Sequence, residues 1–494
     1  EDFFIDDVNY SSWEPSAKGS FDTRGYDVTA GGLVVSNGTF NVDSNDGTWD
    51  IGSSGVDIDP NGTLNATSGT MTVGGDFTVD PNGTFAANSG TVVIDGTCSL
   101  TSATETFNNV TVGTDSAGGE LTLVDAADID GTLAFNTTGG TADLDLGGQT
   151  LNYAGGTLDL TNCDALTEAS STIIIDGTCS LTSATETLNN VTVGTDDASG
   201  ALTLGDAADF DGNLAFNTTG GTAALDLGGQ TLSFGGSTFN LTNCDTFTEA
   251  SSTVTFDGTA EQTVTSNSET YAAIVVTNSH ADGVVFADDF TAASLTNNTA
   301  SSKMTFNAGD TYTITGAAGL DLDGQALGTE IEILSDSADT EFFFDVSGGA
   351  QTVQYVDVKD SNALSNDITA NNSINSRGND DEGDSPHWIF GAVGRYWVGS
   401  AAGAWADDGN WSVSSGGTGG SDYPDAGDTA IFDGSDTDNC TLDAAAAAAV
   451  LDIQSGYSGK VDAVSYDVTL TGTLDVTAGE LELDSGTLSV GGAL

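Results

Sequence analysis

The sequence contains very few cationic residues. Its 494 residues include 74 Asp and Glu but only 7 Lys and Arg, and no Lys or Arg occurs between Arg24 and Lys303. A protein that binds nucleic acid needs a basic surface, so this composition excludes nucleic acid as a partner. An anionic membrane surface is disfavoured for the same reason. The acidity instead favours a saline setting or divalent cations as partners.

Proline and long apolar runs are also scarce. There are 5 prolines, and the longest run of small apolar residues, Ala444 to Ala449, is far too short to cross a bilayer. No segment has the length and period of an amphipathic helix. The sequence opens with Glu1-Asp-Phe-Phe-Ile5 and shows no basic, apolar leader. We therefore expect no membrane insertion, and either a processed chain or part of a longer one.

The chain repeats itself at a fixed interval. The segment 95–106 returns letter for letter as 176–187, so that Asp95 is equivalent to Asp176, and a third, degraded copy opens at Ser252. Strict tandem repetition means that one unit of secondary structure stacks on itself. It excludes most globular enzyme folds.

A shorter period lies inside the repeat. The segment Pro60-Asn-Gly-Thr-Leu64 recurs as Pro81-Asn-Gly-Thr-Phe85. Short β-branched runs such as 91–94 lie between Gly and Asn turn signals. A coil of about 20 residues with three short strands is typical of a parallel β-solenoid, in which strands stack about 4.8 Å apart. We therefore predict an all-β parallel β-solenoid (β-helix) in which four coils make one repeat.

Tandem immunoglobulin-like sandwiches, one for each copy of the repeat, are the alternative fold. They explain the long interval, from Asp95 to Asp176, but not the short one, from Pro60 to Pro81. Disorder is excluded because Val, Ile, Thr and Phe fill short alternating runs, whereas disordered acidic chains lack such residues. The solenoid is therefore the fold that we expect.

The cysteines follow the repeat. Cys98 and Cys179 are equivalent positions, as are Cys163 and Cys244, and Cys440 stands apart. A bridge between Cys163 and Cys179 could not recur in every copy. The positions that would have to pair with Cys98 and with Cys244 in the same way do not hold cysteine. We predict that the cysteines are small buried core residues.

Changes in pattern divide the chain into four segments. Residues 1–30 lack a repeat context and are a candidate inter-subunit strand. The solenoid covers 31–375 and contains the copies 90–170, 171–251 and 252–338. Residues 376–440 form an acidic loop and a junction rich in tryptophan, and 441–494 form a second solenoid segment without a cap. Four of the 6 tryptophans cluster near this junction: Trp388, Trp397, Trp405 and Trp411.

Several motifs resemble those of a known group of proteins. Phe107-Asn-Asn-Val-Thr-Val112, Gly258-Thr-Ala-Glu-Gln-Thr-Val264 and Tyr396-Trp-Val-Gly399 resemble repeats of large secreted bacterial β-solenoid surface proteins. The group includes filamentous-haemagglutinin-like and autotransporter-passenger-like chains. The resemblance implies export to the cell surface or beyond, a β-solenoid, and a structural or adhesive role. It carries over no catalytic residue, because the group shares no catalytic motif.

Acidic loops are the candidate metal sites. Two of them, 433–438 and 379–384, place several carboxylates within one turn, as the oxygen-seeking Ca²⁺ requires. Neither matches a known calcium-loop consensus. Ca²⁺ is the candidate ion, and we expect no other cofactor. The candidate ligands are Asp433, Asp436, Asp438, Asp381 and Asp384.

We expect a protein without enzymatic activity. Residues 25–302 lack the cations that a lyase uses to bind acidic sugars, and His280 and His387 have no Ser or Cys partner motif. Paired Asp residues could support glycoside hydrolysis, but the repeat distributes the acids along the stack. Thr-x-Thr motifs do not recur at a fixed offset, which argues against an ice-binding array. A β-helical polysaccharide-acting enzyme or a phage-type fibre remains an alternative.

An open solenoid exposes strand edges at both ends, and such edges invite pairing. The sequence stops in mid-pattern at its C-terminus, and an apolar strand precedes the repeats. We therefore expect head-to-tail assembly of copies of the chain into an extracellular filament or surface fibre. Further partners would be glycans or a cell surface, and the alternative is a rigid stalk of a larger adhesin. The predicted interface residues are Phe3, Phe4, Ile5, Val8, Tyr10 and Trp13.

Overall fold

Strands make up nearly all the regular structure of the protein. The computed structural model describes residues 3–4, 8–9, 20–23, 26–36, 38–41, 47–136, 138, 140–195, 198–217, 220–376, 378–379, 386–391, 393–399, 403–420 and 423–492. Within these ranges the only helical element is the short 3-10 helix η1 (Asp408–Asn410). No described helix has the length and apolar character needed to cross a bilayer. The chain divides into two compact units, residues 1–254 and 255–494.

The first unit is a solenoid with three faces, and each of its coils contributes one strand to each face. The first face is a single sheet of β1 (Phe3–Phe4), β4 (Val28–Ala30), β7 (Trp49–Ile51), β10 (Thr70–Val73), β13 (Thr91–Ile94), β16 (Asn109–Val112), β19 (Leu133–Phe135), β22 (Thr157–Asp159), β25 (Thr178–Thr182), β28 (Gly200–Leu204), β31 (Ala223–Asp226) and β34 (Thr246–Thr248).

The second face takes the next strand of each coil: β2 (Val8–Asn9), β5 (Leu33–Val35), β8 (Val56–Ile58), β11 (Phe77–Val79), β14 (Thr97–Thr101), β17 (Gly119–Leu123), β20 (Ala142–Asp145) and β23 (Ala165–Thr167), then β26 (Thr187–Leu188), β29 (Ala208–Phe210) and β32 (Thr231–Phe234). The third face takes the last: β3 (Ser20–Asp22), β6 (Gly38–Asn41), β9 (Gly62–Asn65) and β12 (Thr84–Ala86), then β15 (Thr106–Phe107), β18 (Ala127–Ile129), β21 (Thr150–Tyr153), β24 (Thr172–Ile175), β27 (Asn190–Val193), β30 (Leu214–Phe216) and β33 (Thr238–Asn240).

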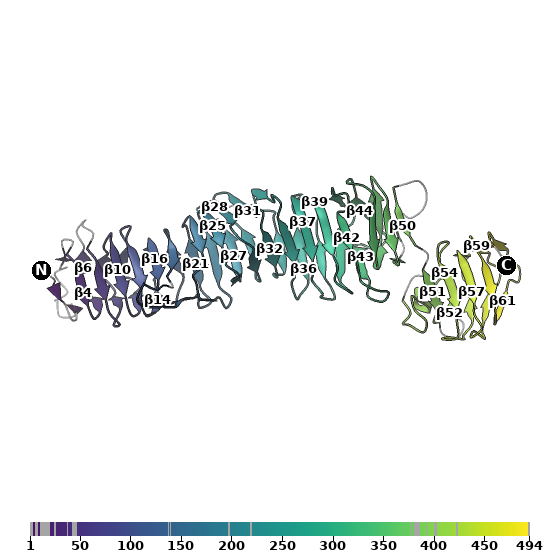
Figure 1. The fold of residues 1–494 in the computed structure, drawn as a ribbon, viewed down its shortest axis with the longest axis horizontal. Coiled ribbons are helices and arrows are strands. Elements are labelled where there is room, and N and C mark those ends of the chain that lie inside the picture. The colour runs from purple at the N-terminus through teal and green to yellow at the C-terminus, as the bar shows by residue number, and fades with distance from the viewer. Residues whose placement is uncertain are drawn as a thin grey trace. The chain divides into compact units, whose positions relative to one another are not determined.

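Neighbouring strands of this unit are parallel and stack coil on coil (Figure 1). Thr70 of β10 lies beside Thr91 of β13, and Val92 of β13 beside Val110 of β16. Alternate side chains of a strand point to opposite faces, so β13 buries Val92 and Ile94 while its threonine remains partly exposed. Each buried Val, Leu or Phe contributes about 1.5–3 kcal/mol. The fold is the predicted parallel β-solenoid, and the antiparallel sandwiches are excluded.

The long repeat comes close to the predicted number of about four coils but does not equal a whole number of them. β13 and β24 are equivalent in the two copies, and their numbers differ by 11. Since a coil uses three strands, one repeat makes three and two-thirds coils. The coils also vary in length, since the register of the first sheet pairs Thr91 with Asn109 in a short coil and Leu133 with Leu158 in a long one.

Equivalent residues of the two copies therefore lie on different faces. β13 belongs to the first face and β24 to the third, while β14 belongs to the second and β25 to the first. The duplicated segment contains eleven strands, one fewer than four complete coils. Each motif therefore lies on a neighbouring face in the next copy. No surface motif of the repeat can then form a straight row along one face of this unit.

The second unit contains two stacks of strands. The first stack holds β36 (Gln262–Thr265), β37 (Thr270–Val276), β38 (Val284–Phe286), β39 (Thr291–Asn297), β40 (Lys303–Phe306), β41 (Thr311–Ile314), β42 (Leu320–Leu322), β43 (Ile331–Ser335), β44 (Phe342–Asp345), β45 (Gln351–Gln354), β46 (Val356–Lys359), β47 (Ser361–Leu364), β48 (Ile368–Asn371), β49 (Ile374–Asn375) and β50 (Trp388–Phe390). β35 (Thr253–Phe256) spans the unit boundary. Aromatic rings fill the core of this stack, for example Phe306 stacked on Phe342 at 4.5 Å.

The C-terminal stack has its own three sheets. They contain β51 (Gly394–Trp397), β53 (Trp411–Ser412), β54 (Thr429–Phe432), β57 (Val450–Ile453) and β60 (Leu474–Val476); β52 (Gly403–Ala404), β55 (Cys440–Thr441), β58 (Lys460–Asp462) and β61 (Glu480–Glu482); and β56 (Ala446–Ala448), β59 (Val468–Leu470) and β62 (Leu488–Val490). The pair of β51 and β53 is antiparallel, and the other pairs of this stack are parallel. The segment assigned from sequence to a junction thus supplies β51 to β55 of this stack.

Candidate functional site

The strands predicted for assembly lie at the outer edge of the first unit. β1 pairs in parallel with β4, and β2 with β5. Phe3, Phe4 and Val8 lie in these two edge strands, which form part of the first coil. Their outer edges have no partner strand among the described residues. Three further predicted residues lie outside the described part of the chain: Ile5, Tyr10 and Trp13.

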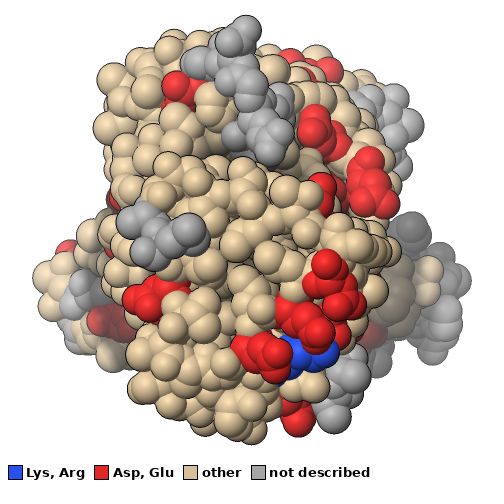
Figure 2. All heavy atoms as spheres, turned by 90° about the vertical axis from the view of Figure 1, so that its right-hand side faces the viewer, with Lys and Arg blue, Asp and Glu red and all other residues tan. Residues whose placement is uncertain are grey.

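The last coil of the C-terminal stack presents a second set of edges. β60, β61 and β62 are each the terminal strand of a sheet. Apolar side chains there are covered on one side only, and Val476 remains 45% exposed. Figure 2, which looks onto this end, shows broad uncharged surface between separate groups of carboxylates, more of them on the right of the view than on the left. The partly buried apolar residues of this coil are Leu474, Leu481, Leu483, Leu488 and Val490.

The carboxylates predicted to bind Ca²⁺ close local turns. Asp433 Oδ1 accepts hydrogen bonds from the amide and the hydroxyl of Ser435 at 2.8 and 2.5 Å. Burial acts to raise the pKa of Asp433, but hydrogen bonds from Ser415 and Ser435 lower it overall. Asp436 Oδ1 accepts the amide of Asp438 at 2.8 Å.

The structure does not bring these acids together into a cluster. In the part of the chain that the structure describes, no group of three or more His, Cys, Asp or Glu is placed to hold a metal ion. Asp381 and Asp384 lie outside the described residues. A Ca²⁺ site therefore stays a prediction.

Other carboxylates hold one coil to the next, a role that the sequence did not suggest. Asp125 accepts the amides of Ser102 and Ala103 from the preceding coil at 2.7 and 2.8 Å, and Ser102 donates its hydroxyl to the carbonyl of Ala126. Ala103 has a φ of 49°, in the left-handed region of the backbone. We call this arrangement the carboxylate latch. It recurs at Asp206 in the second copy and at Asp288 in the second unit.

The latch shows how acids are used where cations are absent. A carboxylate that accepts two amides satisfies backbone donors at a corner where the strand ladder is interrupted. It needs no side-chain cation. Because each latch involves only two adjacent coils, it can be copied with the repeat.

All five cysteines are buried, as predicted. Burial raises the pKa of Cys98 to about 12 and those of Cys163 and Cys179 to about 11. A thiol with such a pKa is neutral at pH 7 and a poor nucleophile. These cysteines therefore pack as small core residues whose thiols are protonated at neutral pH.

The tryptophans of the predicted junction separate into two groups. Trp411 contacts Trp397 and Trp405 in the C-terminal stack, with ring centroids 5.2 and 5.0 Å apart. Its Nε1 donates to the carbonyl of Trp405 at 2.7 Å. Trp388 instead packs in the first stack of this unit, on Phe390 at 5.8 Å. The four tryptophans therefore do not form one junction. Three of them belong to the core of the C-terminal stack, and Trp388 belongs to the first stack.

The main candidate site is a pocket around a buried arginine. A pocket of about 400 Å³ is lined by residues of β49, β50 and β51 and by the loop 425–428. Arg395 of β51 is 1% exposed, and its Nε lies 3.1 Å from Asp428 Oδ2. Burial raises the pKa of Asp428 while Arg395 acts to lower it. Asp428 also accepts the amides of Val393 and Asp425.

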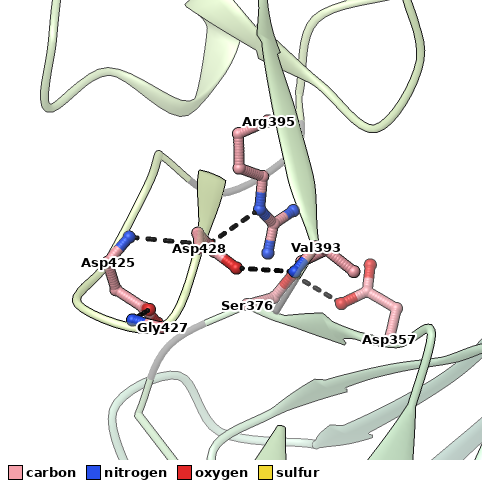
Figure 3. Close-up of polar contacts among 7 residues, drawn as sticks. All are labelled: Asp357, Ser376, Val393, Arg395, Asp425, Gly427 and Asp428. Carbon is pink, nitrogen blue, oxygen red and sulfur yellow. Dashed lines mark hydrogen bonds and ion pairs between the residues drawn. The ribbon is translucent and has the colours of Figure 1, made fainter. Parts of the chain in front are cut away.

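A second carboxylate faces the same arginine. In Figure 3 the guanidinium of Arg395 lies between Asp428 on one side and Ser376 and Asp357 on the other. Ser376 donates its hydroxyl to Asp357 Oδ1 at 2.5 Å. Burial raises the pKa of Asp357 to about 6, against the lowering effects of Ser376 and Arg395, and Glu332 and Glu330 raise it further. The arginine charge is therefore more than balanced at neutral pH.

Two polar atoms of this pocket have no hydrogen-bond partner among the described residues. They are Nη1 of Arg395 and Nδ1 of His387. His387 Nδ1 lies 3.9 Å from Asp367 Oδ1, which is beyond hydrogen-bond distance. A buried donor without an acceptor costs about 1–3 kcal/mol, so such atoms mark places where a further group fits.

Sequence reasoning treated His387 only as a catalytic candidate and did not select Arg395. One signal was available, because an arginine inside the apolar run 394–398 must be buried with a partner if that run is a strand. The partner could not be found from sequence, since Asp428 belongs to a distant loop that nothing in the pattern links to this strand. No family model, no curated protein and no solved structure matches the chain.

Proposed function

We propose that the chain is an extracellular structural protein that assembles head to tail into a filament. The observation that supports this proposal is that the first and the last described coils each have strands with one unpaired edge. β1 and β2 at one end, and β60, β61 and β62 at the other, have a partner strand on one side only among the described residues. Export is supported by the resemblance of the repeats to secreted solenoid proteins.

The first and last coils have the same strand number and the same strand direction. Both have three strands, since β3 completes the first coil, and both continue parallel sheets. A second copy stacked on the last coil would extend the same parallel ladders and cover the apolar side chains of that coil. The bond between copies would be heterologous, and such contacts form filaments when they do not close.

Negative-stain microscopy and sedimentation velocity of the full chain test the proposal. We expect fibres whose length grows with protein concentration. The double change Leu481→Lys and Leu488→Lys should leave single particles, because it places charges in the contact. Val124→Lys, at a side chain that is 51% exposed in the first unit, is the matched control and should still form fibres.

Removal of residues 1–12 should also stop fibre growth. Single particles of the unchanged protein at every concentration contradict the filament and support a stalk. Fibres of the double lysine variant contradict the proposed contact.

A further inference from the structure

The pocket at Arg395 has the features of a binding site. Its arginine is 1% exposed and yet leaves Nη1 without a hydrogen-bond acceptor among the described residues. A guanidinium offers five donors, and an arginine used only for the ion pair would not need an open pocket beside it. The unused donor can be satisfied by an oxygen acceptor of a bound molecule.

The charges around the pocket limit what that molecule can be. Asp428 lies 3.1 Å from Arg395 Nε, Asp357 faces the same guanidinium, and Asp425 lies at the rim. Asp367 Oδ1 lies 3.9 Å from Nδ1 of His387, which lines the pocket. An anion would meet more negative than positive charge here. A cation would meet the guanidinium at the centre of the pocket, so both charged classes are disfavoured.

A neutral hydroxyl group satisfies both kinds of neighbour. One hydroxyl oxygen can accept from Arg395 Nη1 while its hydrogen is donated to a carboxylate of the pocket lining such as Asp425. A molecule with several adjacent hydroxyls repeats this arrangement along the pocket wall. Phe390 and Ile389 supply an apolar surface beside the polar groups. This combination of a few directed polar groups and an apolar wall is typical of small-molecule sites.

We propose that this pocket binds a neutral saccharide unit through Arg395. A volume of about 400 Å³ is within the range of small-ligand sites and far above the roughly 30 Å³ of one water molecule. Arg395 donates to a hydroxyl or ring oxygen, and Asp425 and Asp428, which also line the pocket, accept from neighbouring hydroxyls. The site is independent of end-to-end assembly, because it lies on β49 to β51 and not on the edge strands.

Saturation-transfer NMR with the full chain tests the proposal. The probes are glucose, galactose, mannose and N-acetylglucosamine, with glucuronate as the acidic counterpart. We expect transfer to at least one neutral sugar and at least fivefold less to glucuronate. Arg395→Gln should reduce the transfer at least fivefold.

A filling variant keeps the test valid if Arg395→Gln does not fold. Ile389 lines the pocket and is 38% exposed, so Ile389→Trp should block the site at little cost in folding. Leu327→Trp, at a side chain that is 48% exposed and outside the pocket, is the matched control. It should bind as the unchanged protein does.

A third variant separates charge from shape. Asp357→Asn keeps the size of the side chain and its contact with Ser376 but removes a negative charge. It should raise the transfer to glucuronate at least threefold. The proposal is wrong if no neutral sugar gives transfer, which would leave a water-filled pocket. It is also wrong if Ile389→Trp leaves the transfer unchanged, or if the unchanged protein prefers glucuronate.

Discussion

The tandem copies and the C-terminal stack use the same coil but stabilise it differently. In the copies, the first sheet pairs residues of successive coils that are close in sequence, such as Thr91 with Asn109, and carboxylate latches join adjacent coils. In the C-terminal stack, Gly394 pairs with Thr429 across a much longer excursion of the chain. Its core holds three tryptophans and the buried ion pair of Arg395 and Asp428.

The difference shows which interactions can be duplicated. A latch needs only the next coil, so copying the repeat segment copies complete latches at Asp125 and Asp206. The contacts of Trp411 and Arg395 join segments that occur once. Duplication can therefore lengthen the first kind of solenoid, whereas the contacts of the second kind occur once and are able to shape a specific pocket.

The largest expected effect is at the aromatic core. Trp411 is fully buried and contacts Trp397, Trp405 and Phe432. Trp411→Ala removes these contacts, and we expect a loss of about 3–5 kcal/mol from the C-terminal stack. Urea unfolding followed by tryptophan fluorescence measures it, because most tryptophans lie in the second unit.

If the two regions are stabilised separately, Trp411→Ala should lower the stability of the C-terminal stack only. The repeats should unfold at the unchanged urea concentration, as followed by circular dichroism, because their coils depend on adjacent coils only. A parallel shift of both signals would show that the two regions fold together. Tyr466→Ala, at a ring that is 39% exposed in the same stack, is the control and should change little.

The latch should have the next largest effect. Asp206→Ala leaves the amides of Ser183 and Ala184 without their acceptor, and we expect a loss of about 1–3 kcal/mol. Asp206→Asn should lie between, because an amide has one acceptor oxygen where the carboxylate has two. Hydrogen exchange at the two amides is the direct measurement.

The matched control for the latch is Asp115→Ala. Asp115 accepts a hydrogen bond from the side chain of Asn136 at an exposed corner, and its loss should cost less than about 0.5 kcal/mol. Equal effects at Asp115 and Asp206 would contradict a specific role for the latch.

Sequence was sufficient for the fold because the solenoid is a local structure. The recurrence of the Pro-Asn-Gly motif at Pro60 and Pro81 and the alternation at residues 91–94 contain the coil and its buried face. The count of eleven strands could not be obtained, because short strands such as β15 have no distinct pattern. The pocket could not be predicted either, since its groups meet only through the course of the chain from 357 to 428.

A smaller effect is expected from pH. Burial raises the pKa of Glu168 from 4.5 to about 7, and Asp211 and Glu186 add to the rise against a lowering hydrogen bond from Asn189. The folded chain then binds this proton more tightly than the unfolded chain. The resulting stability is present below pH 4.5 and is lost as pH rises through about 7.

Asp357, with a pKa raised to about 6 chiefly by burial, acts in the same direction. The free energy of unfolding should therefore fall between pH 5 and pH 8 by roughly 1–2 kcal/mol per such group after allowance for solvent screening, and the urea midpoint should fall with it. Glu168→Gln should flatten this dependence, and Glu120→Gln, at an exposed carboxylate, should not. A midpoint that rises with pH would show that other carboxylates dominate.

The smallest expected effect is a difference in how the cysteines of the two regions react with a thiol reagent. Cys163 in the first copy is 8% exposed, whereas Cys440 in the C-terminal stack is fully buried. Burial keeps both thiols protonated, so a thiol reagent at pH 8 should label neither within minutes. In urea, Cys440 should react as one step with the unfolding of its stack, because its neighbours form one core. Cys163 should react gradually, because coils joined by local latches open a few at a time. Mass spectrometry of labelled peptides distinguishes the two, and simultaneous labelling would remove the distinction between a core held by unique contacts and one held by copied ones.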